Sequence, residues 1–296
     1  MHLAPLQTIR FLFQHPLSSQ KPIDAVVRYM RWQLGSRLSP GPIVVDFAED
    51  ARLLVRPGMT GATGNVYAGL HEYEDMAFVL HVLRPGDLFV DVGANVGSYT
   101  VLAAKVAGAR VVAFEPIAST FQALADNIAL NAISDRVEAR RECVGRSSGV
   151  VKMSANLDTV NHVLTEQAPD ATSIEVPLVS LDEALTEAPF LIKLDVEGYE
   201  LEALHGAKRV LADPALQALV VEINLSGDRY GRSDAEVFRL IEQQGFQLYD
   251  YDPKQRTLVP GDLHRKRANH LYVRDAARVQ ERLRTAKKIR VQGQQI

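Results

Sequence analysis

Cysteine is almost absent from this chain, since Cys143 is the only one among its 296 residues. A single cysteine excludes an intrachain disulfide and favours a reducing compartment, which by default is the cytoplasm. An excess of basic charge is also lacking, because 33 Lys and Arg are set against 36 Asp and Glu, for a net charge of −3. Without a basic field or interleaved aromatic and basic residues, a nucleic-acid partner is not expected.

Long apolar runs are missing as well. No stretch approaches the roughly 20 apolar residues of a membrane-spanning helix. Near the start, Pro5, Arg10 and Pro16 interrupt the apolar region that a signal peptide needs. We therefore expect a soluble globular protein, and its 47% hydrophobic residues are enough to bury a large core.

The most informative segment present is LFVDVGANVG, residues 88–97. Its apolar half predicts a buried parallel strand, and residues 98–107 predict the helix that returns over that strand. Gly93 and Gly97 permit a tight turn and a close approach to a ligand, while the start of the helix supplies unpaired N–H groups. The segment therefore predicts a nucleotide-cofactor loop.

The spacing of this loop discriminates between cofactors. A dinucleotide fingerprint needs glycine at positions that here hold Gly93, Asn95 and Ser98. Two of these three positions do not hold glycine, which disfavours an NAD-dependent oxidoreductase. The pattern Asp91, Gly93 and Gly97 instead resembles the S-adenosylmethionine (SAM) loop of class I methyltransferases, where the acid and the loop backbone hold the methionine part of the cofactor.

A second apolar strand also ends on an acid. VVAFEP, residues 111–116, brings Glu115 to a position 18 residues beyond Gly97, which is one strand–helix–strand unit along. An acid at that position can accept hydrogen bonds from both hydroxyls of a ribose. Glu115 therefore strengthens the prediction of a nucleoside-containing cofactor.

The third segment that carries chemistry is FLIKLDVEGYELEALHGA, residues 190–207. It predicts a strand that ends at Asp195, a turn at Gly198 and a following helix. Asp195 and Glu197 are thus placed at the carboxyl edge of the sheet, where open α/β sheets bind ligands. If the strand over residues 88–92 is its neighbour across the strand-order switch, the two loops face each other.

Strands and helices alternate from residue 72 onwards. Strands are predicted at residues 88–92, 110–114, 136–141, 190–194, 217–223, 246–251 and near 271–273. Helices are predicted at residues 73–83, 98–107, 118–130, 199–211 and 233–244. Such alternation indicates a mostly parallel sheet with helices on both faces.

The segments VDVGANVG, AFEP and IKLDVEGYE, in this order and at these separations, closely resemble FkbM-type SAM-dependent methyltransferases. The resemblance extends over residues 69–273, including GLHEYED at residues 69–75. It implies a class I methyltransferase fold, with a seven-stranded, mostly parallel sheet whose last strand is antiparallel. It also implies methyl transfer from SAM to an oxygen, commonly a hydroxyl of a saccharide, a glycolipid or a polyketide-type natural product.

The resemblance also implies a division of the chain. Residues 71–274 would form the methyltransferase domain, with residues 149–180 as an insertion. Residues 1–70 would be an N-terminal extension, and residues 275–296 a basic helical tail. The sequence carries no indication of the oligomeric state.

Local patterns give the extension some detail. A helix is predicted at residues 22–34, and short strands at residues 43–47 and 52–55 can pair as a hairpin. The Gly-rich segment at residues 56–65 is expected to be a loop, either a plain surface loop or a mobile lid.

Site residues follow from the matching positions. The predicted cofactor-binding residues are Asp91, Gly93, Ala94, Asn95, Gly97, Ser98, Glu115, Cys143 and Val144. Glu115 matches the ribose acid, and Cys143 and Val144 follow the third strand, where adenine is usually contacted.

Catalysis requires a group that takes the proton of the acceptor hydroxyl. We predict Asp195 for this role, with Glu197 or Glu222 assisting, and like charges this close raise at least one carboxylate pKa. The three acids are also suitable oxygen ligands for a divalent cation, although no metal is assigned. Structural roles are the alternatives, with Glu197 capping the helix and Glu222 pairing with Lys193.

The acceptor is the least defined part of the prediction. Arg229, Tyr230 and Arg232 lie in a loop over the same sheet edge and are candidates for contacting hydroxyls or phosphate. A degenerate methyltransferase fold that serves as a binding module is the non-enzymatic alternative.

Overall fold

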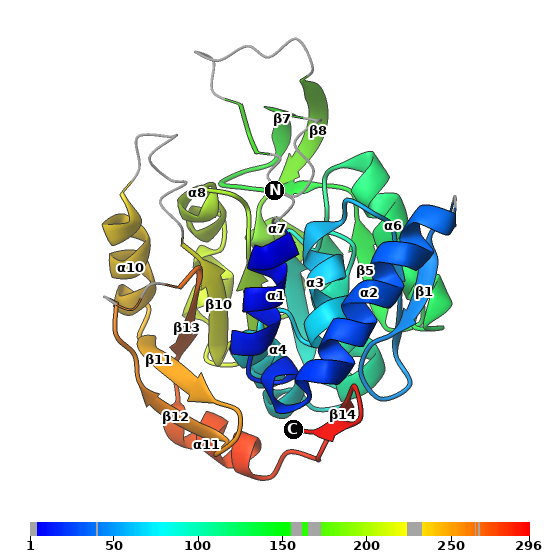
Figure 1. The fold of residues 1–296 in the computed structure, drawn as a ribbon. Helices are drawn as coiled ribbons and strands as arrows, with labels where there is room; N and C mark the ends of the chain where they lie inside the picture. Colours follow the sequence, from blue (N-terminus) through cyan, green and yellow to red (C-terminus); the bar gives the residue numbers. More distant parts are fainter. Residues whose placement is uncertain are drawn as a thin grey trace.

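The computed structural model describes residues 5–39, 41–154, 162–164, 173–223, 233–263, 265 and 267–296. At its centre lies an eight-stranded sheet of order β12-β11-β13-β10-β9-β3-β4-β5 (Figure 1). Its strands are β3 Leu88–Val92, β4 Arg110–Phe114, β5 Val137–Arg140, β9 Leu191–Leu194, β10 Ala218–Glu222, β11 Gln247–Asp252, β12 Thr257–Pro260 and β13 Asn269–Val273.

Strand directions confirm the class I methyltransferase sheet. The strands β5, β4, β3, β9 and β10 pair in parallel, and β13 is antiparallel to both of its neighbours. The seven expected strands are all present, and β12 adds an eighth at the edge. The Asp252 carboxylate accepts hydrogen bonds from the Lys254 and Gln255 N–H groups, which turns the chain back into β12.

Alternating side chains of the strands fill two cores. On β3, Phe89 points into one core, and Leu88, Val90 and Val92 point into the other. The first core is covered by α1 Pro5–Gln14, α2 Pro22–Leu38, α3 Thr60–Ala68, α4 Tyr73–Val82, α5 Ser98–Val101, α6 Ala118–Leu130 and α11 Ala276–Arg284. The second is covered by α7 Leu181–Ala184, α8 Glu200–His205, α9 Lys208–Ala212 and α10 Asp234–Gln243. Helices on both faces are thus confirmed.

The prediction of a loop at residues 56–65 is wrong, because helix α3 begins at Thr60. Tertiary contacts override the low helix propensity of its glycines. Asn65 is buried, its amide donates to Ser98 Oγ at 3.1 Å, and its Oδ1 accepts from the His71 N–H at 2.7 Å. At Gly64 a Cβ would lie 2.3 Å from His71 Nδ1, so glycine permits this close packing.

Two predicted helices are interrupted. The helix expected at residues 98–107 continues from α5 as a π-helix, Leu102–Ala107. The helix expected at residues 199–211 splits into α8 and α9. The break falls at Gly206, where a Cβ would lie 2.0 Å from the carbonyl oxygen of Gly145.

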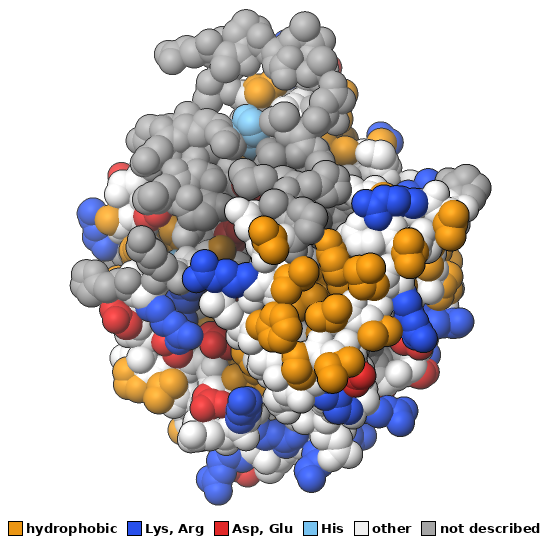
Figure 2. Space-filling model, in the orientation of Figure 1, with side chains coloured by type: hydrophobic (Ala, Val, Ile, Leu, Met, Phe, Trp, Pro, Cys, Tyr) orange, Lys and Arg blue, Asp and Glu red, His pale blue; other side chains and the backbone are white. Residues whose placement is uncertain are grey.

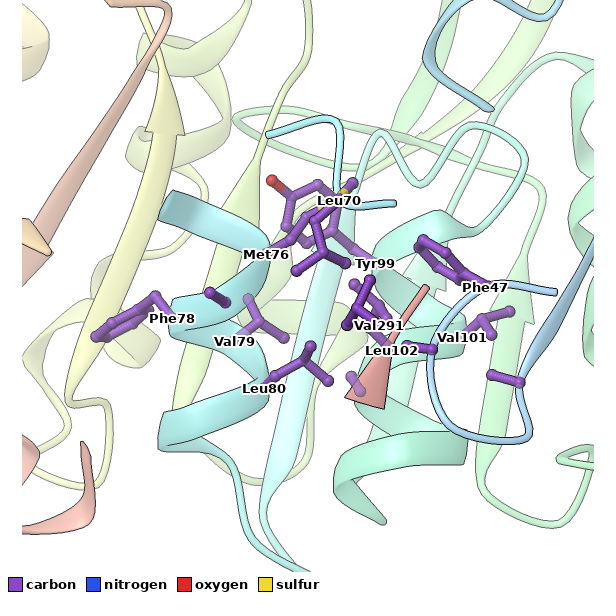
Figure 3. Close-up of a cluster of buried hydrophobic side chains, with 14 of the residues drawn as sticks. Phe47, Leu70, Met76, Phe78, Val79, Leu80, Tyr99, Val101, Leu102 and Val291 are labelled. Carbon is purple, nitrogen blue, oxygen red and sulfur yellow. The ribbon is translucent and has the colours of Figure 1, made fainter. Parts of the chain in front are cut away.

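Both ends of the described chain enter the first core. In the N-terminal part, β1 Ile43–Asp46 and β2 Arg52–Val55 form the predicted antiparallel hairpin. The tail forms α11 and a second hairpin, β14 Arg290–Val291 with β15 Gln294–Gln295. Figure 3 shows Val291 of this hairpin among Phe47, Leu70 and Leu102, all of which belong to the first core. The tail is therefore held by the same core as the sheet.

Replacing Leu283 tests this packing, because its side chain is fully buried on α11. We expect Leu283→Ala to lower the free energy of unfolding by about 3 kcal/mol, as for other buried leucines. Urea unfolding at equilibrium measures the change. The exposed neighbour variant Arg284→Ala should change it by less than about 0.5 kcal/mol. An equally small effect of Leu283→Ala would show that the tail does not stabilise the fold.

Candidate functional site

A cavity of about 300 Å³ lies at the carboxyl ends of β3, β4, β9 and β10. Eleven of the twelve predicted site residues line it. They are Asp91, Gly93, Ala94, Asn95, Ser98, Glu115, Cys143, Val144, Asp195, Glu197 and Glu222. The cavity therefore brings together the three segments that the sequence singles out, and Gly97 is the exception.

The loops after β3 and β9 touch through their backbones. Gly93 has a φ of 79°, and a Cβ there would lie 1.8 Å from the carbonyl oxygen of Asp195. The Asp195 N–H donates to the carbonyl oxygen of Val92 at 3.1 Å. Only glycine fits this approach, and the expected facing of the two loops is confirmed.

Gly97 acts behind the cavity wall. Its φ of 89° ends the loop, and a Cβ would lie 2.5 Å from Leu124 Cδ1 on α6. The loop amides are also directed inward, because the N–H groups of residues 93–97 all donate to acceptors within the chain. The loop therefore offers a ligand its carbonyl oxygens and the Asn95 side chain rather than its amides.

Glu115 is held in a fixed orientation. Its Oε2 accepts from the Asn95 N–H at 3.0 Å, and its Oε1 accepts from the Ile117 N–H at 2.9 Å. Burial raises the pKa of Glu115 to about 7, against the opposing effect of these two hydrogen bonds. Each carboxylate oxygen retains a second lone pair, so the side chain can still accept hydrogen bonds from a ligand.

Asp91 has one satisfied and one unsatisfied oxygen. Oδ2 accepts from Thr100 Oγ1 at 2.7 Å, whereas Oδ1 has no hydrogen-bond partner in the described part of the chain. The residue is 1% exposed, and burial raises its pKa while Lys193 lowers it. A buried acceptor without a partner is costly, so this oxygen indicates a place for a ligand donor.

The opposite end of the cavity is apolar. Four lining residues, Ile117, Cys143, Met153 and Val163, belong to one small hydrophobic cluster. Cys143 starts β6 Cys143–Val144, which forms a small sheet with β7 Gly149–Met153 and β8 Ile174–Val179. Burial raises the pKa of the Cys143 thiol to about 12, so it is neutral. This end suits a flat apolar ring such as adenine.

Asp195, Glu197 and Glu222 form an acidic cluster with carboxylate oxygens within 4.8 Å of one another. Lys193 is only 3% exposed, and its ammonium donates a hydrogen bond to Asp195 Oδ2 at 2.7 Å. Burial alone would raise the pKa of Asp195, but Lys193 and a hydrogen bond with Glu222 lower it. Burial and the neighbouring Asp195 raise the pKa of Glu222 to about 10.

These opposite shifts define the protonation state at neutral pH. They favour a proton on Glu222 and an ionised Asp195, whose charge the Lys193 ammonium offsets. Lys193 forms its ion pair with Asp195, at 2.7 Å, and it also acts on Glu222 by lowering the pKa of that carboxyl. At the helix start Glu200 Oε1 accepts from the Gly198 N–H at 3.0 Å. Glu197 has a φ of 53°, a strained conformation that often marks functional sites.

The sequence analysis missed a buried network behind Lys193. Tyr99 Oη donates to Glu72 Oε2 at 2.8 Å, and the Lys193 ammonium lies 4.8 Å from the centroid of the Tyr99 ring. The Asn269 amide donates to Glu72 Oε1 at 2.8 Å and to Asp75 Oδ2 at 3.0 Å. Glu72 and Tyr99 line the cavity. Glu72 and Asp75 lie in the GLHEYED segment, which has no chemical pattern of its own, and Tyr99 lies in the helix predicted at residues 98–107.

Three residues predicted to contact the acceptor are not placed by the structure. Arg229, Tyr230 and Arg232 lie outside the described residues.

A family model described as the methyltransferase FkbM domain matches residues 91–248, just over half of the chain. The chain belongs to the FkbM methyltransferase family. The matched region of this FkbM-family chain runs from the end of β3 into β11 and contains Glu115, Asp195 and Glu222. Glu72 lies before it.

Individual relatives agree with this assignment. The chain is 28% identical to the hexuronic acid methyltransferase AglP of Haloferax volcanii over 165 residues, covering 53% of this chain and 64% of AglP. It is 29% identical to the 31-O-demethyl-FK506 methyltransferase FkbM of Streptomyces tacrolimicus over 221 residues, covering 61% of this chain and 82% of that protein.

Among solved structures, a methyltransferase FkbM from Methylobacillus flagellatus KT aligns with a TM-score of 0.45 and 17% identity. The alignment covers 85% of this chain and 60% of the other. The chain thus spans less than two thirds of that protein and of AglP.

The proton on Glu222 makes stability depend on pH. An unfolded glutamate loses its proton near pH 4.5, whereas folded Glu222 keeps it to about 10, so folding takes up a proton between these values. Stability should therefore fall as pH rises through this window, by up to about 1.4 kcal/mol per pH unit. Glu222→Gln should flatten the slope between pH 6 and 9 in urea unfolding, and the exposed variant Glu175→Gln should not. Equal slopes in wild type and Glu222→Gln would contradict the shared proton.

Proposed function

We propose that this chain is a SAM-dependent O-methyltransferase acting on a hydroxyl of a saccharide, a glycolipid or a polyketide-like natural product. The carrying observation is the acidic cluster that faces the β3 loop across one cavity, with Asp195 ionised and backed by Lys193. A carboxylate in that position can receive the proton of a hydroxyl beside a methyl donor.

The cavity wall offers a set of groups that fits SAM. The unpartnered Asp91 Oδ1 suits the cofactor's amino group, the fixed Glu115 carboxylate suits the ribose hydroxyls, and the apolar end at Cys143 suits adenine. SAM supplies a methyl group on a sulfonium, which is transferred in line to a nucleophile.

Asp195 is the proposed proton acceptor. Lys193 and protonated Glu222 hold its carboxylate in place. Both groups can adjust their hydrogen bonds when the carboxylate takes up a proton and loses its charge. Glu222 assists as a positioning residue that hydrogen-bonds with Asp195, and Glu197 completes the cluster on the same side of the cavity. The low pKa of Asp195 suits a proton transfer that occurs late, when the acceptor oxygen has become acidic.

The relatives' names support the acceptor class. One is described as a methyltransferase of a hexuronic acid, and the other as a methyltransferase of 31-O-demethyl-FK506. Both descriptions are consistent with a sugar or polyketide-like hydroxyl. A cytoplasmic location, expected from the single cysteine, is part of the same proposal.

Two substitutions separate cofactor binding from proton transfer. We expect Glu115→Ala to weaken SAM binding at least tenfold in calorimetry, because a buried, oriented acceptor is lost; an interaction of about 1.5 kcal/mol corresponds to this factor. Asp195→Asn should retain SAM affinity but lower methyl transfer about 10²- to 10⁴-fold. Transfer is followed with labelled SAM and fractionated sugar, glycolipid and metabolite acceptors.

The exposed variant Glu138→Ala serves as the matched control and should change neither quantity. Wild-type protein without SAM affinity would refute the cofactor assignment. SAM binding without methyl transfer to any acceptor fraction would support the binding-module alternative. An unchanged rate of methyl transfer in Asp195→Asn would show that Asp195 is not the proton acceptor.

Metal dependence gives an independent test of the acidic cluster. The Lys193 ammonium offsets the charge of Asp195 and a proton on Glu222 removes a second charge, which leaves Glu197 as the remaining anion of the cluster and lowers the need for a cation. We expect EDTA to change the initial rate less than twofold, and added Mg²⁺ to have no effect. Loss of activity in EDTA that Mg²⁺ restores would instead assign these carboxylates as metal ligands.

A further inference from the structure

Exposed large hydrophobic side chains gather on α1 and α2 in the described part of the chain. Eight of the eleven large hydrophobic side chains that are exposed in this part of the molecule lie between residues 6 and 44. They are Leu6, Phe13, Ile23, Val27, Met30, Leu34, Leu38 and Val44. Figure 2 shows hydrophobic side chains gathered on the face where Figure 1 draws α1 and α2. Monomeric proteins rarely expose such contiguous patches without a binding role.

The α2 members form a regular stripe. Ile23, Val27, Met30, Leu34 and Leu38 are spaced by three or four residues, which places them on one face of a helix. The opposite face of α2 buries Ala25, Tyr29 and Trp32 in the first core. The helix is therefore anchored on one side and apolar on its outer side as well.

Basic side chains border the stripe. On a helix of 3.6 residues per turn, Arg31 and Arg37 fall on its two edges, and both are exposed. Arg10 lies between Leu6 and Phe13 on the outer face of α1, and Lys21 precedes α2. The only carboxylate on α1 and α2 is Asp24. This local positive charge contrasts with the net charge of −3 for the whole chain.

We propose that the face of α1 and α2 docks on a membrane surface that carries anionic lipid. Apolar side chains enter the boundary between headgroups and acyl chains, and the arginines at the edges contact lipid phosphates, as in interfacial amphipathic helices. The long arginine side chains reach the headgroups while their methylene groups follow the apolar stripe. No described helix is long and apolar enough to cross a bilayer, so the contact is peripheral.

A second copy of the chain fits this face less well. A two-fold pairing centred on Met30 brings the two copies of Arg31 together, and Asp24 lies two turns away. Like charges in such an interface are destabilising. An anionic bilayer removes this conflict because it supplies negative charge along the whole stripe.

The docking face lies one helix away from the cavity. Helix α3 lines the cavity through Ala62 and Asn65. On its other side, Arg28 of α2 donates to the carbonyl oxygen of Tyr67 at 3.0 Å, and the Tyr29 and Tyr67 rings are 5.2 Å apart. A docked face therefore favours glycolipids among the proposed acceptors. That step rests on the proposed function, whereas the docking itself does not.

Vesicle flotation tests the docking. Purified full-length protein is mixed with phosphatidylcholine vesicles, either pure or containing one quarter phosphatidylglycerol. We expect flotation with the anionic vesicles and its weakening in high salt. Arg31→Gln with Arg37→Gln should lower the partition coefficient about 30-fold, since each basic residue near the surface contributes about 1 kcal/mol. Met30→Glu with Leu34→Glu should lower it more than tenfold.

The matched control is Val150→Glu with Val259→Glu, which changes two exposed valines outside the patch and should float like wild type. Thermal unfolding establishes that each variant is folded, and the arginine pair keeps the test valid if the glutamate pair is not. Equal flotation of all variants would overturn the proposal. Absence of wild-type flotation would also overturn it. Light scattering would then tell whether the protein is a monomer or a dimer that Met30→Glu with Leu34→Glu dissociates. Failure of methyl transfer would leave flotation unchanged.

Discussion

The buried ammonium of Lys193 is the charge on which the site depends. It pairs with Asp195, lies over the Tyr99 ring, and lowers the pKa of Asp91, Asp75 and Glu222 as well. Several carboxylates on this sheet edge could not remain buried without a cation. A neutral residue at position 193 would leave the partly buried Asp195 carboxylate without its ion-pair partner, and its proton affinity would rise. Lys193 thus couples the stability of the sheet edge to the ionised state proposed for catalysis.

The sequence predicted the parts of the site that are local in the chain. Asp91, Glu115 and Asp195 each end an apolar strand, and parallel strands bring their carboxyl ends to one edge. The pattern of apolar residues and the position of each acid at a strand end were therefore sufficient to predict a shared cavity. The same reasoning predicted the mostly parallel sheet with helices on both faces, because each strand and its return helix form a local unit, whereas the antiparallel last strand was implied by the family resemblance.

Features that depend on contacts between distant segments could not be predicted in this way. Helix α3 contains two glycines in its first five residues, and Asn65, His71 and Ser98 hold it only after folding. Glu72 acquires its role from Tyr99 and Asn269, which are 27 and 197 residues away in the chain. The assignment of the proton to Glu222 likewise required the mutual distances of three side chains. Composition and periodicity contain none of this information.

The scarcity of cysteine has a practical consequence. Cys143 is 4% exposed at the apolar end of the cavity, and its neutral thiol reacts slowly with electrophiles. A thiol reagent can modify it only when this wall opens, so the labelling rate measures the free energy of that local opening. Because no other thiol competes, a single mass shift reports on one position. The chain therefore contains its own site-specific probe of motion at the cavity, without any engineered label.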